Sequence, residues 1–137
     1  MIFGIGTDLV AIDRVAATYQ RFARHFVERL LMPAELERFE RLAAGDRRRV
    51  RFLAQRFAAK EAIVKALGTG FGHGVWIRDC GVIANAWGRP EVVWSERGLQ
   101  VAQALGAGAG HVSLTDEGGF VIAVAVLEHS ERPTGEA

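Results

Sequence analysis

The chain has 137 residues, half of them hydrophobic, and a formal net charge of +1. This length predicts a single domain with a proper core, and the near-neutral charge argues against a nucleic-acid-binding module. The apolar surplus is generous for a small soluble domain and indicates a buried subunit interface.

The cysteine content and the N-terminus bear on the compartment. Cys80 is the only cysteine, which excludes an internal disulfide and fits a reducing cytosol. Residues Met1–Gly6 lack the basic start and long apolar core of a signal peptide. The longest apolar run, Phe120–Leu127, is too short to span a bilayer. We therefore expect a soluble, cytoplasmic protein with no membrane partner.

The chain begins with a short predicted strand, Ile2–Gly6, whose glycines would let a backbone or a ligand come close. Thr7 and Asp8 are expected to end it. A carboxylate just past a strand commonly caps the next helix, but Asp13 is the better cap because it directly precedes a helical pattern. Asp8 is thereby left without a local duty.

Two helices are expected next, one from Asp13 to about Leu31 and a shorter one from Pro33 to Leu42. The first helix has a basic outer face, whose members are Arg14, Arg21, Arg24 and His25. Such a row is either an ordinary solvated face or a docking surface for an acidic partner.

The stretch from Arg51 to Leu67 consists almost wholly of strong helix formers, and Gly68 follows as a helix stop. Apolar residues lie nearly all round this helix, which predicts that it is buried. It nevertheless carries four central charges, Arg56, Lys60, Glu61 and Lys65. These need partners, because an unpaired buried ion costs several kcal/mol.

Pairing within the helix accounts for only part of this charge. Glu61 and Lys65 are i,i+4 neighbours and can pair, whereas Arg56 and Lys60 have no obvious carboxylate. Buried charges cluster where chemistry is done, so we favour a functional site over internal pairing alone. Such a site would hold an anion near the cations and a metal near Glu61. The preceding arginine-rich loop, residues 43–51, is either solvated or reaches a phosphate.

The rest of the chain predicts two hairpins with a helix between them. The helix is capped by Ser95 and runs to Leu105. The strands are Cys80–Ala84, Glu91–Trp94, His111–Thr115 and Phe120–Leu127. The last strand is apolar on both faces, so we expect it centrally in a sheet or at a subunit contact.

These elements predict an α+β class: a compact single domain, residues 1–128, with an antiparallel sheet and a long buried central helix. The polar tail, residues 129–137, is expected to be disordered.

Three separated motifs then coincide, in order. They are Gly4-Ile-Gly-Thr-Asp8, Arg56-Phe-Ala-Ala-Lys-Glu-Ala62 with Lys65-Ala-Leu-Gly-Thr-Gly70, and His111-Val-Ser-Leu-Thr115. Together with Gly88-Arg-Pro90 in the first hairpin, they resemble the holo-[acyl-carrier-protein] synthase family, the small bacterial-type branch of the 4′-phosphopantetheinyl transferases. The resemblance extends from Met1 to about Glu128. One departure is Asp116, where several members carry a second histidine; other members share the Asp-Glu pair found here.

The resemblance implies transfer of the phosphopantetheine arm of coenzyme A to a serine hydroxyl of apo acyl carrier protein. Adenosine 3′,5′-bisphosphate is the other product, and the setting is fatty acid biosynthesis. The resemblance also implies the 4′-phosphopantetheinyl transferase fold, a homotrimer with sites between subunits, and a Mg²⁺ ion ligated by Asp8 and Glu61. Phosphoryl transfer needs positioning and charge neutralisation, and Mg²⁺ is typically held by one or two carboxylates, so the residues fit this chemistry.

Further residues are expected to contact the substrates. Lys65 is the candidate for a phosphate contact and completes a catalytic set with Asp8 and Glu61; pairing with Glu61 is its structural alternative. The other candidate coenzyme contacts are Arg56, Lys60, Gly68, Thr69, Gly70 and His111. A structural role for His111 is equally open. The general base is left open among a metal-bound water, Glu61 and a second carboxylate. The basic face of the first helix is expected to dock the acidic carrier protein.

Two other classes of protein compete with this interpretation. A non-catalytic coenzyme A or nucleotide sensor would keep the pocket but lack a metal carboxylate, and both carboxylates are present. A nucleic-acid-binding module would use the arginines of residues 47–51 and of the first helix. The absence of an aromatic stacking platform counts against that module.

Overall fold

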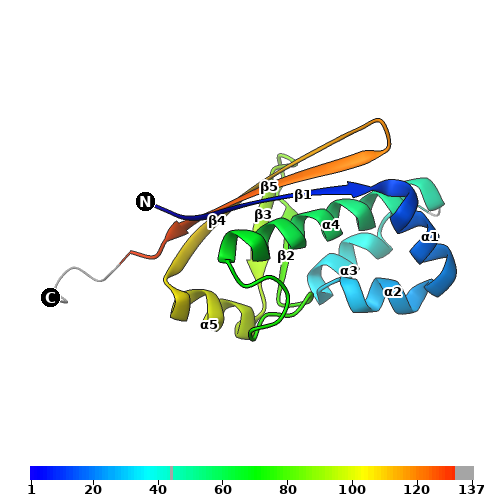
Figure 1. Cartoon of the computed structure of the whole chain (residues 1–137). Coiled ribbons are helices and arrows are strands. Elements are labelled where there is room, and N and C mark those ends of the chain that lie inside the picture. Colours follow the sequence, from blue (N-terminus) through cyan, green and yellow to red (C-terminus); the bar gives the residue numbers. More distant parts are fainter. Residues whose placement is uncertain (44, 132–137) are drawn as a thin grey trace, which may run out of the picture.

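The computed structural model describes residues 1–43 and 45–131 and shows one antiparallel sheet lying against a long helix (Figure 1). The strands, in the order β1-β5-β4-β3-β2, are β1 Ile2–Ala11, β5 Phe120–His129, β4 Ala107–Glu117, β3 Pro90–Trp94 and β2 Cys80–Ala84. The helices are α1 Ile12–Phe22, α2 Arg24–Leu30, α3 Pro33–Glu40, α4 Asp46–Leu67 and α5 Glu96–Leu105. The predicted α+β class is confirmed.

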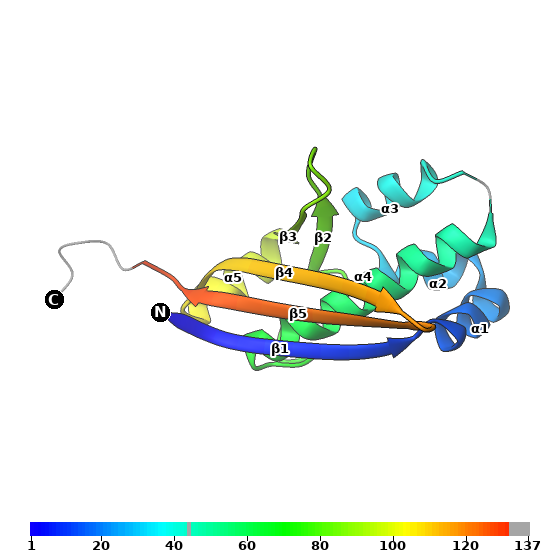
Figure 2. The same cartoon turned by 90° about the horizontal axis from the view of Figure 1, so that it is seen from above.

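The sheet has two parts. Figure 2 shows the long strands β1, β5 and β4 side by side, while the β2–β3 hairpin stands away from them. The two parts join where Glu91 of β3 pairs with His111 of β4. Helices α1 to α3 gather around one end of α4, and α5 lies toward the other (Figure 1).

The core lies between α4 and the long strands. Side chains of β5 alternate, so that Val121, Ala123, Ala125 and Leu127 are fully buried, whereas Phe120, Ile122 and Val124 face outward. The prediction that this strand is central is confirmed, because it pairs with β1 on one side and β4 on the other.

Two glycines let β1 and α4 touch backbone to backbone. A Cβ on Gly4 would lie 1.9 Å from the carbonyl oxygen of Ala66, and one on Gly6 would lie 1.9 Å from that of Ala62. Only glycine fits these two positions. The close approach therefore explains the Gly-x-Gly pattern, and it sets the position of β1 along α4.

The N-terminal elements differ from the prediction in two ways. Thr7 and Asp8 do not end the first strand, because pairing with β5 continues through them to Ala11. The predicted first helix is two helices, broken at Ala23, whose φ of 47° is left-handed. Asp13 is not the cap either: Ala11 occupies the N-cap, and Asp13 lies in the first turn of α1.

The central helix is longer than predicted. It begins at Asp46, so the arginines expected in a loop belong to its first turns. Its end is as predicted, because Gly68 adopts a left-handed φ of 87° and its amide donates to the carbonyl of Val64 over 3.0 Å. The predicted cap at Ser95 is also confirmed, since its side chain accepts from the amide of Gly98 over 3.0 Å.

The C-terminal boundary shifts slightly. Strand β5 runs to His129, one residue past the predicted end of the domain at residue 128. Residues 132–137 of the predicted tail lie outside the described residues. Among the helices of residues 1–43 and 45–131, none combines the length and apolar character needed to cross a bilayer.

Candidate functional site

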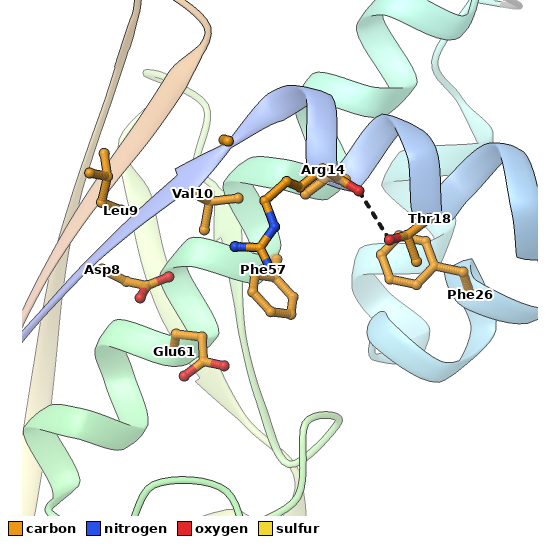
Figure 3. A pocket seen from close by; sticks show the side chains of 10 residues that line it. Asp8, Leu9, Val10, Arg14, Thr18, Phe26, Phe57 and Glu61 are labelled. Carbon is orange, nitrogen blue, oxygen red and sulfur yellow. Dashed lines mark hydrogen bonds between the residues drawn. The ribbon is translucent and has the colours of Figure 1, made fainter.

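A cavity of about 400 Å³ lies where β1 runs into α1, beside α4 (Figure 3). Its charged lining residues are Asp8 from β1, Arg14 from α1 and Glu61 from α4. Phe26 and Phe57 line it as well and make part of the wall apolar. Figure 3 shows both carboxylates and the Arg14 guanidinium directed into the same space. The structure thus brings together two carboxylates that lie 53 residues apart in the sequence (61 − 8).

The packing of β1 on α4 explains this meeting. Gly4 lies against Ala66 and Gly6 against Ala62, so two residues of strand match four residues of helix. Two residues of a strand and four residues of a helix both span about 6–7 Å, so contacts between β1 and α4 repeat at the same spacing along both elements. One further step along the same face of β1 reaches Asp8, beside the turn of α4 that carries Glu61.

Lys65 pairs with Asp8. Its Nζ donates to Asp8 Oδ1 over 3.2 Å and to the carbonyl oxygen of Thr7 over 3.0 Å. The Lys65 side chain is 50% exposed and that of Asp8 15%. The alternative of a Glu61–Lys65 pair is not what the structure shows: within the described part of the chain, Glu61 has no ion-pair partner inside 4.0 Å.

Glu61 is a partly buried carboxylate beside a second one. Burial raises the pKa of the Glu61 carboxyl above its ordinary value, the Asp8 carboxylate raises it further, and Lys65 opposes both. A bound cation would relieve this repulsion. Three or more His, Cys, Asp or Glu side chains do not gather into a metal site anywhere in residues 1–43 and 45–131. Two carboxylates are nevertheless the usual protein contribution to Mg²⁺ sites, which waters and substrate phosphates complete. Asp8 and Glu61 therefore fit such an ion.

Arg56 and Lys60 have a carboxylate that the sequence analysis did not find. Glu35 of α3 is fully buried, and its Oε1 lies 2.5 Å from Lys60 Nζ. Its Oε2 lies 3.7 Å from Arg56 Nε. The inference that these cations lack a carboxylate was wrong. Glu35 lies more than 20 residues upstream in another helix, where it looked only like a favourable first-turn charge.

Lys60 therefore has no route to a coenzyme. Its side chain is 0% exposed, and its Nζ also donates to the carbonyl oxygen of Cys80. The predicted coenzyme contact of Lys60 is corrected to an internal one. Cys80 itself offers no nucleophile, because burial raises the pKa of its thiol to about 12.

Arg56 does not use all of its hydrogen-bonding capacity within the described structure. Its guanidinium carbon lies 4.1 Å from the centroid of the Phe52 ring, and its Nε has no hydrogen-bond partner within the described structure. Burial lowers the pKa of Arg56, against the opposing charge of Glu35. Arg56 also lines a second cavity, of about 480 Å³, together with Arg89 and Ser113. This second cavity is separate from the Asp8–Glu61 cavity.

The segment Gly68-Thr-Gly70, which was predicted to contact the coenzyme, directly follows the end of α4. The amides of all three residues donate to the carbonyl oxygen of Val64, over 3.0 to 3.2 Å. They are therefore committed to closing the helix and are not free donors for a phosphate.

His111 lies on the outer face of the sheet, whereas Asp8 faces α4. Its Nε2 lies 2.8 Å from Glu128 Oε2, and this hydrogen bond lowers the pKa of Glu128. The structure does not bring His111 to the Asp8–Glu61 cavity of the same chain. Asp116, at the far end of the same strand, instead holds α4 by accepting from Arg51 and Gln55.

The predicted basic face is divided by the break at Ala23. Arg14 lines the cavity, and Arg21 lies over the ring of Phe22. Arg24, on α2, pairs with Glu28 and Glu40, and its hydrogen bonds with Glu40 and then Glu28 raise its pKa. His25 is exposed on α2. These four side chains do not form the single helical row that the sequence suggested.

Comparison with known proteins identifies the family of this chain. The family model of the 4′-phosphopantetheinyl transferase superfamily matches residues 4–125. A holo-[acyl-carrier-protein] synthase of Thiobacillus denitrificans is 44% identical over 132 residues, which are 95% of this chain and 96% of the relative. The chain belongs to the holo-[acyl-carrier-protein] synthase family.

Solved structures of the family have the same fold. The crystal structure of the Neisseria meningitidis synthase matches with a TM-score of 0.85 and 38% identity, over 93% of this chain and 99% of that one. A Bacillus anthracis synthase in complex with CoA (3′,5′-ADP) matches with a TM-score of 0.77 and 33% identity, over 95% and 99% of the two chains. The predicted family and fold are confirmed.

Proposed function

We propose that this enzyme carries out the family's transfer in the Asp8–Glu61 cavity and depends on Mg²⁺. The reaction moves the 4′-phosphopantetheine arm of coenzyme A to a serine hydroxyl of apo acyl carrier protein and releases adenosine 3′,5′-bisphosphate. Its membership of the holo-[acyl-carrier-protein] synthase family supports the transfer itself. The observation that carries the assignment of the site is the meeting of Asp8 and Glu61 in one cavity, with repulsion that a cation would relieve.

Asp8 and Glu61 would hold the ion. When bound, Mg²⁺ neutralises phosphate oxygens and stabilises charge on the leaving phosphate. Lys65 is anchored by Thr7 and Asp8 while half of its side chain stays exposed, so its ammonium group can also meet a phosphate. Phe26 and Phe57 give this charged part of the cavity an apolar wall.

We place the carrier protein at the mouth of the cavity. Arg14 lies on α1 and also lines the cavity, so an acidic partner bound there would bring its serine close to the carboxylates. Arg21 and His25 are exposed as well and would add positive charge on α1 and α2. Arg24 contributes less, because its guanidinium is already paired with Glu28 and Glu40.

The outer face of the sheet supports an oligomer. Its large apolar side chains are exposed: Ile5 59%, Leu9 61%, Phe120 47% and Ile122 45%. Contiguous apolar surface of this kind marks contacts between proteins. His111 lies on the same outer face, so a site shared between subunits would take it from a neighbouring copy. We therefore retain the homotrimer with sites between subunits, each subunit a single domain of about residues 1–128.

Sedimentation equilibrium tests the assembly. A mass three times that of the chain is expected at micromolar concentration. A fully active monomer would contradict both the trimer and the shared site. The cytoplasmic location and the role in lipid metabolism remain predictions.

Mass spectrometry tests the activity. Apo acyl carrier protein incubated with this enzyme, coenzyme A and Mg²⁺ should gain the mass of the phosphopantetheine arm. Chelating the divalent ions with EDTA should stop the gain, and adding Mg²⁺ back should restore it. No gain would contradict the transfer, whereas a gain that EDTA leaves unchanged would contradict the role of the metal.

A further inference from the structure

A fully buried charged cluster lies on α4 away from the cavity, and the proposed reaction does not use it. Its centre is the carboxylate of Glu35, which accepts from the backbone amides of Met32 over 3.0 Å and Val82 over 3.1 Å. Lys60 Nζ lies 2.5 Å from the same carboxylate and also donates to the carbonyl oxygen of Cys80. One ion pair thus connects α3, α4 and β2.

The surroundings fix this pair tightly. A Cβ at Gly81 would lie 2.7 Å from the Glu35 carboxyl carbon, so β2 approaches as closely as glycine allows. Neither side chain of the pair is exposed. The Lys60 ammonium must reach both the Glu35 carboxylate and the Cys80 carbonyl oxygen, which limits the rotation of α4 about its own axis.

The other buried contacts of α4 are mostly apolar. They combine small side chains, such as Ala58 and Ala62, with larger ones, such as Leu53 and Ile63. Apolar contacts have no direction, so the charged pair adds a directional constraint that they lack. The contact with β1 is backbone to backbone at Gly4 and Gly6, and it fixes position along the helix more than rotation.

Rotation of α4 matters because Glu61 directly follows Lys60. The end of a side chain lies about 6 Å from the helix axis, so a rotation of about 20° would move it by about 2 Å. A misplacement of about 1 Å in an active site can cost about 10²-fold in rate. The Glu61 carboxylate therefore depends on whatever fixes the helix.

We infer that Glu35 is a positioning residue: its buried pair with Lys60 sets the rotation of α4 and holds Glu61 opposite Asp8. This inference rests on the proposed Mg²⁺ site. It assigns to Glu35 and Lys60 a part in the reaction although neither touches substrate.

The decisive variant replaces the pair by apolar residues, Glu35→Leu together with Lys60→Met. Exchanging a buried ion pair for apolar side chains of similar volume is often neutral for stability. The Met32 and Val82 amides and the Cys80 carbonyl nevertheless lose their partners, so the double variant should melt at a lower temperature, and it is compared with a variant of matched stability loss. Without the directional bonds, calorimetric titration with Mg²⁺ should show about 10- to 100-fold weaker binding, the usual effect of losing a group that orients a metal ligand. The kcat should fall at low Mg²⁺ and recover in part at high Mg²⁺, with the KM for coenzyme A unchanged.

Two further variants separate positioning from general damage. Glu35→Gln keeps the shape but leaves Lys60 without its counter-charge, so both Mg²⁺ affinity and melting temperature should fall. Leu127→Ala destabilises the core at the other end of the sheet and should lower the melting temperature without changing Mg²⁺ affinity.

Unaltered Mg²⁺ affinity and turnover in a folded double variant would overturn the inference and leave the pair a stabilising role only. A loss of Mg²⁺ affinity in Leu127→Ala equal to that in the double variant would overturn it as well. An unaltered protein that works without Mg²⁺ would instead contradict the proposed function. The Mg²⁺ affinity of the variants relative to the unaltered protein thus tests the positioning role of Glu35. The Mg²⁺ dependence of the unaltered protein separately tests the proposed function.

Discussion

Two charged clusters lie on the same helix and differ in how their charges are compensated. Around Glu35, the partners of the carboxylate are two backbone amides and Lys60, and all of them are buried. Around Asp8, the paired cation Lys65 is half exposed, and Glu61 has no ion-pair partner within the described residues. A charge in an apolar helix is therefore no sign of a ligand site by itself. The sign is a charge that the folded chain leaves uncompensated.

The largest expected effect comes from removing the uncompensated carboxylates. Asp8→Ala and Glu61→Ala should each lower kcat at least about 10²-fold, because each removes a ligand of the ion that stabilises the transition state. The free energy of unfolding should change by no more than about 1 kcal/mol, since the site is partly exposed. Phosphopantetheine transfer at limiting Mg²⁺ and urea unfolding measure the two quantities. Near-normal turnover at limiting Mg²⁺ would remove that residue from the metal site.

The compensated cluster should behave in the opposite way. Lys60→Ala leaves the Glu35 carboxylate buried without its cation, which costs about 3–5 kcal/mol of stability. The matched control is Lys65→Ala, whose half-exposed pair with Asp8 should cost less than about 1 kcal/mol. Urea unfolding compares them. Equal losses for the two lysines would mean that burial does not distinguish these clusters.

The arginines of α1 and α2 extend the comparison to the surface. Arg14→Glu with Arg21→Glu should raise the KM for the carrier protein about tenfold at low salt and flatten its salt dependence, because steering by exposed charge is screened. Arg24→Glu should raise this KM less, since Glu28 and Glu40 already occupy its guanidinium. Steady-state kinetics at two ionic strengths measure both. If the KM for coenzyme A rises equally, the substitutions have damaged the cavity instead.

The smallest effect concerns the cost of ionising Glu61. Its pKa in the folded protein is raised, by burial first and by Asp8 second, above the ordinary 4.5 expected of the unfolded chain. Ionised Glu61 therefore destabilises the metal-free protein. This penalty is complete above the raised pKa, and it fades as the pH falls through that pKa toward 4.5.

Glu61→Gln should accordingly raise the melting temperature in EDTA at pH 7, by about 2 °C or less for a partly exposed group. The advantage should shrink as the pH falls toward the pKa of the unfolded chain. Circular dichroism melts across that range measure it. A lower melting temperature of the variant at pH 7 would show that Glu61 is stabilised by contacts rather than strained.

Several features were predictable because they depend on neighbours in the sequence. The end of α4 at Gly68, the cap at Ser95 and the strand Cys80–Ala84 follow from local propensity and turn chemistry. The motifs around Asp8 and Glu61 also indicated the family, although not how the two residues meet. Their meeting required the approach of β1 to α4 that Gly4 and Gly6 permit.

Other features were decided by contacts between distant parts of the chain. Strand β1 continues past Asp8 because β5 pairs with it, and this pairing outweighs the weak local signal for an end. The partner of Lys65 is Asp8 rather than Glu61, its neighbour one turn away, because β1 brings a carboxylate and a carbonyl to the same ammonium.

The sequence by itself determined the fold class and the central helix, because hydrophobic periodicity is written in short stretches, and the family resemblance of its motifs indicated the two carboxylates. Only the tertiary structure decided which charges are compensated. Glu35 and Lys60 are 25 residues apart (60 − 35), and no local pattern connects them. Their pairing exists because α3 and β2 pack around α4, where desolvation makes every buried charge find a partner.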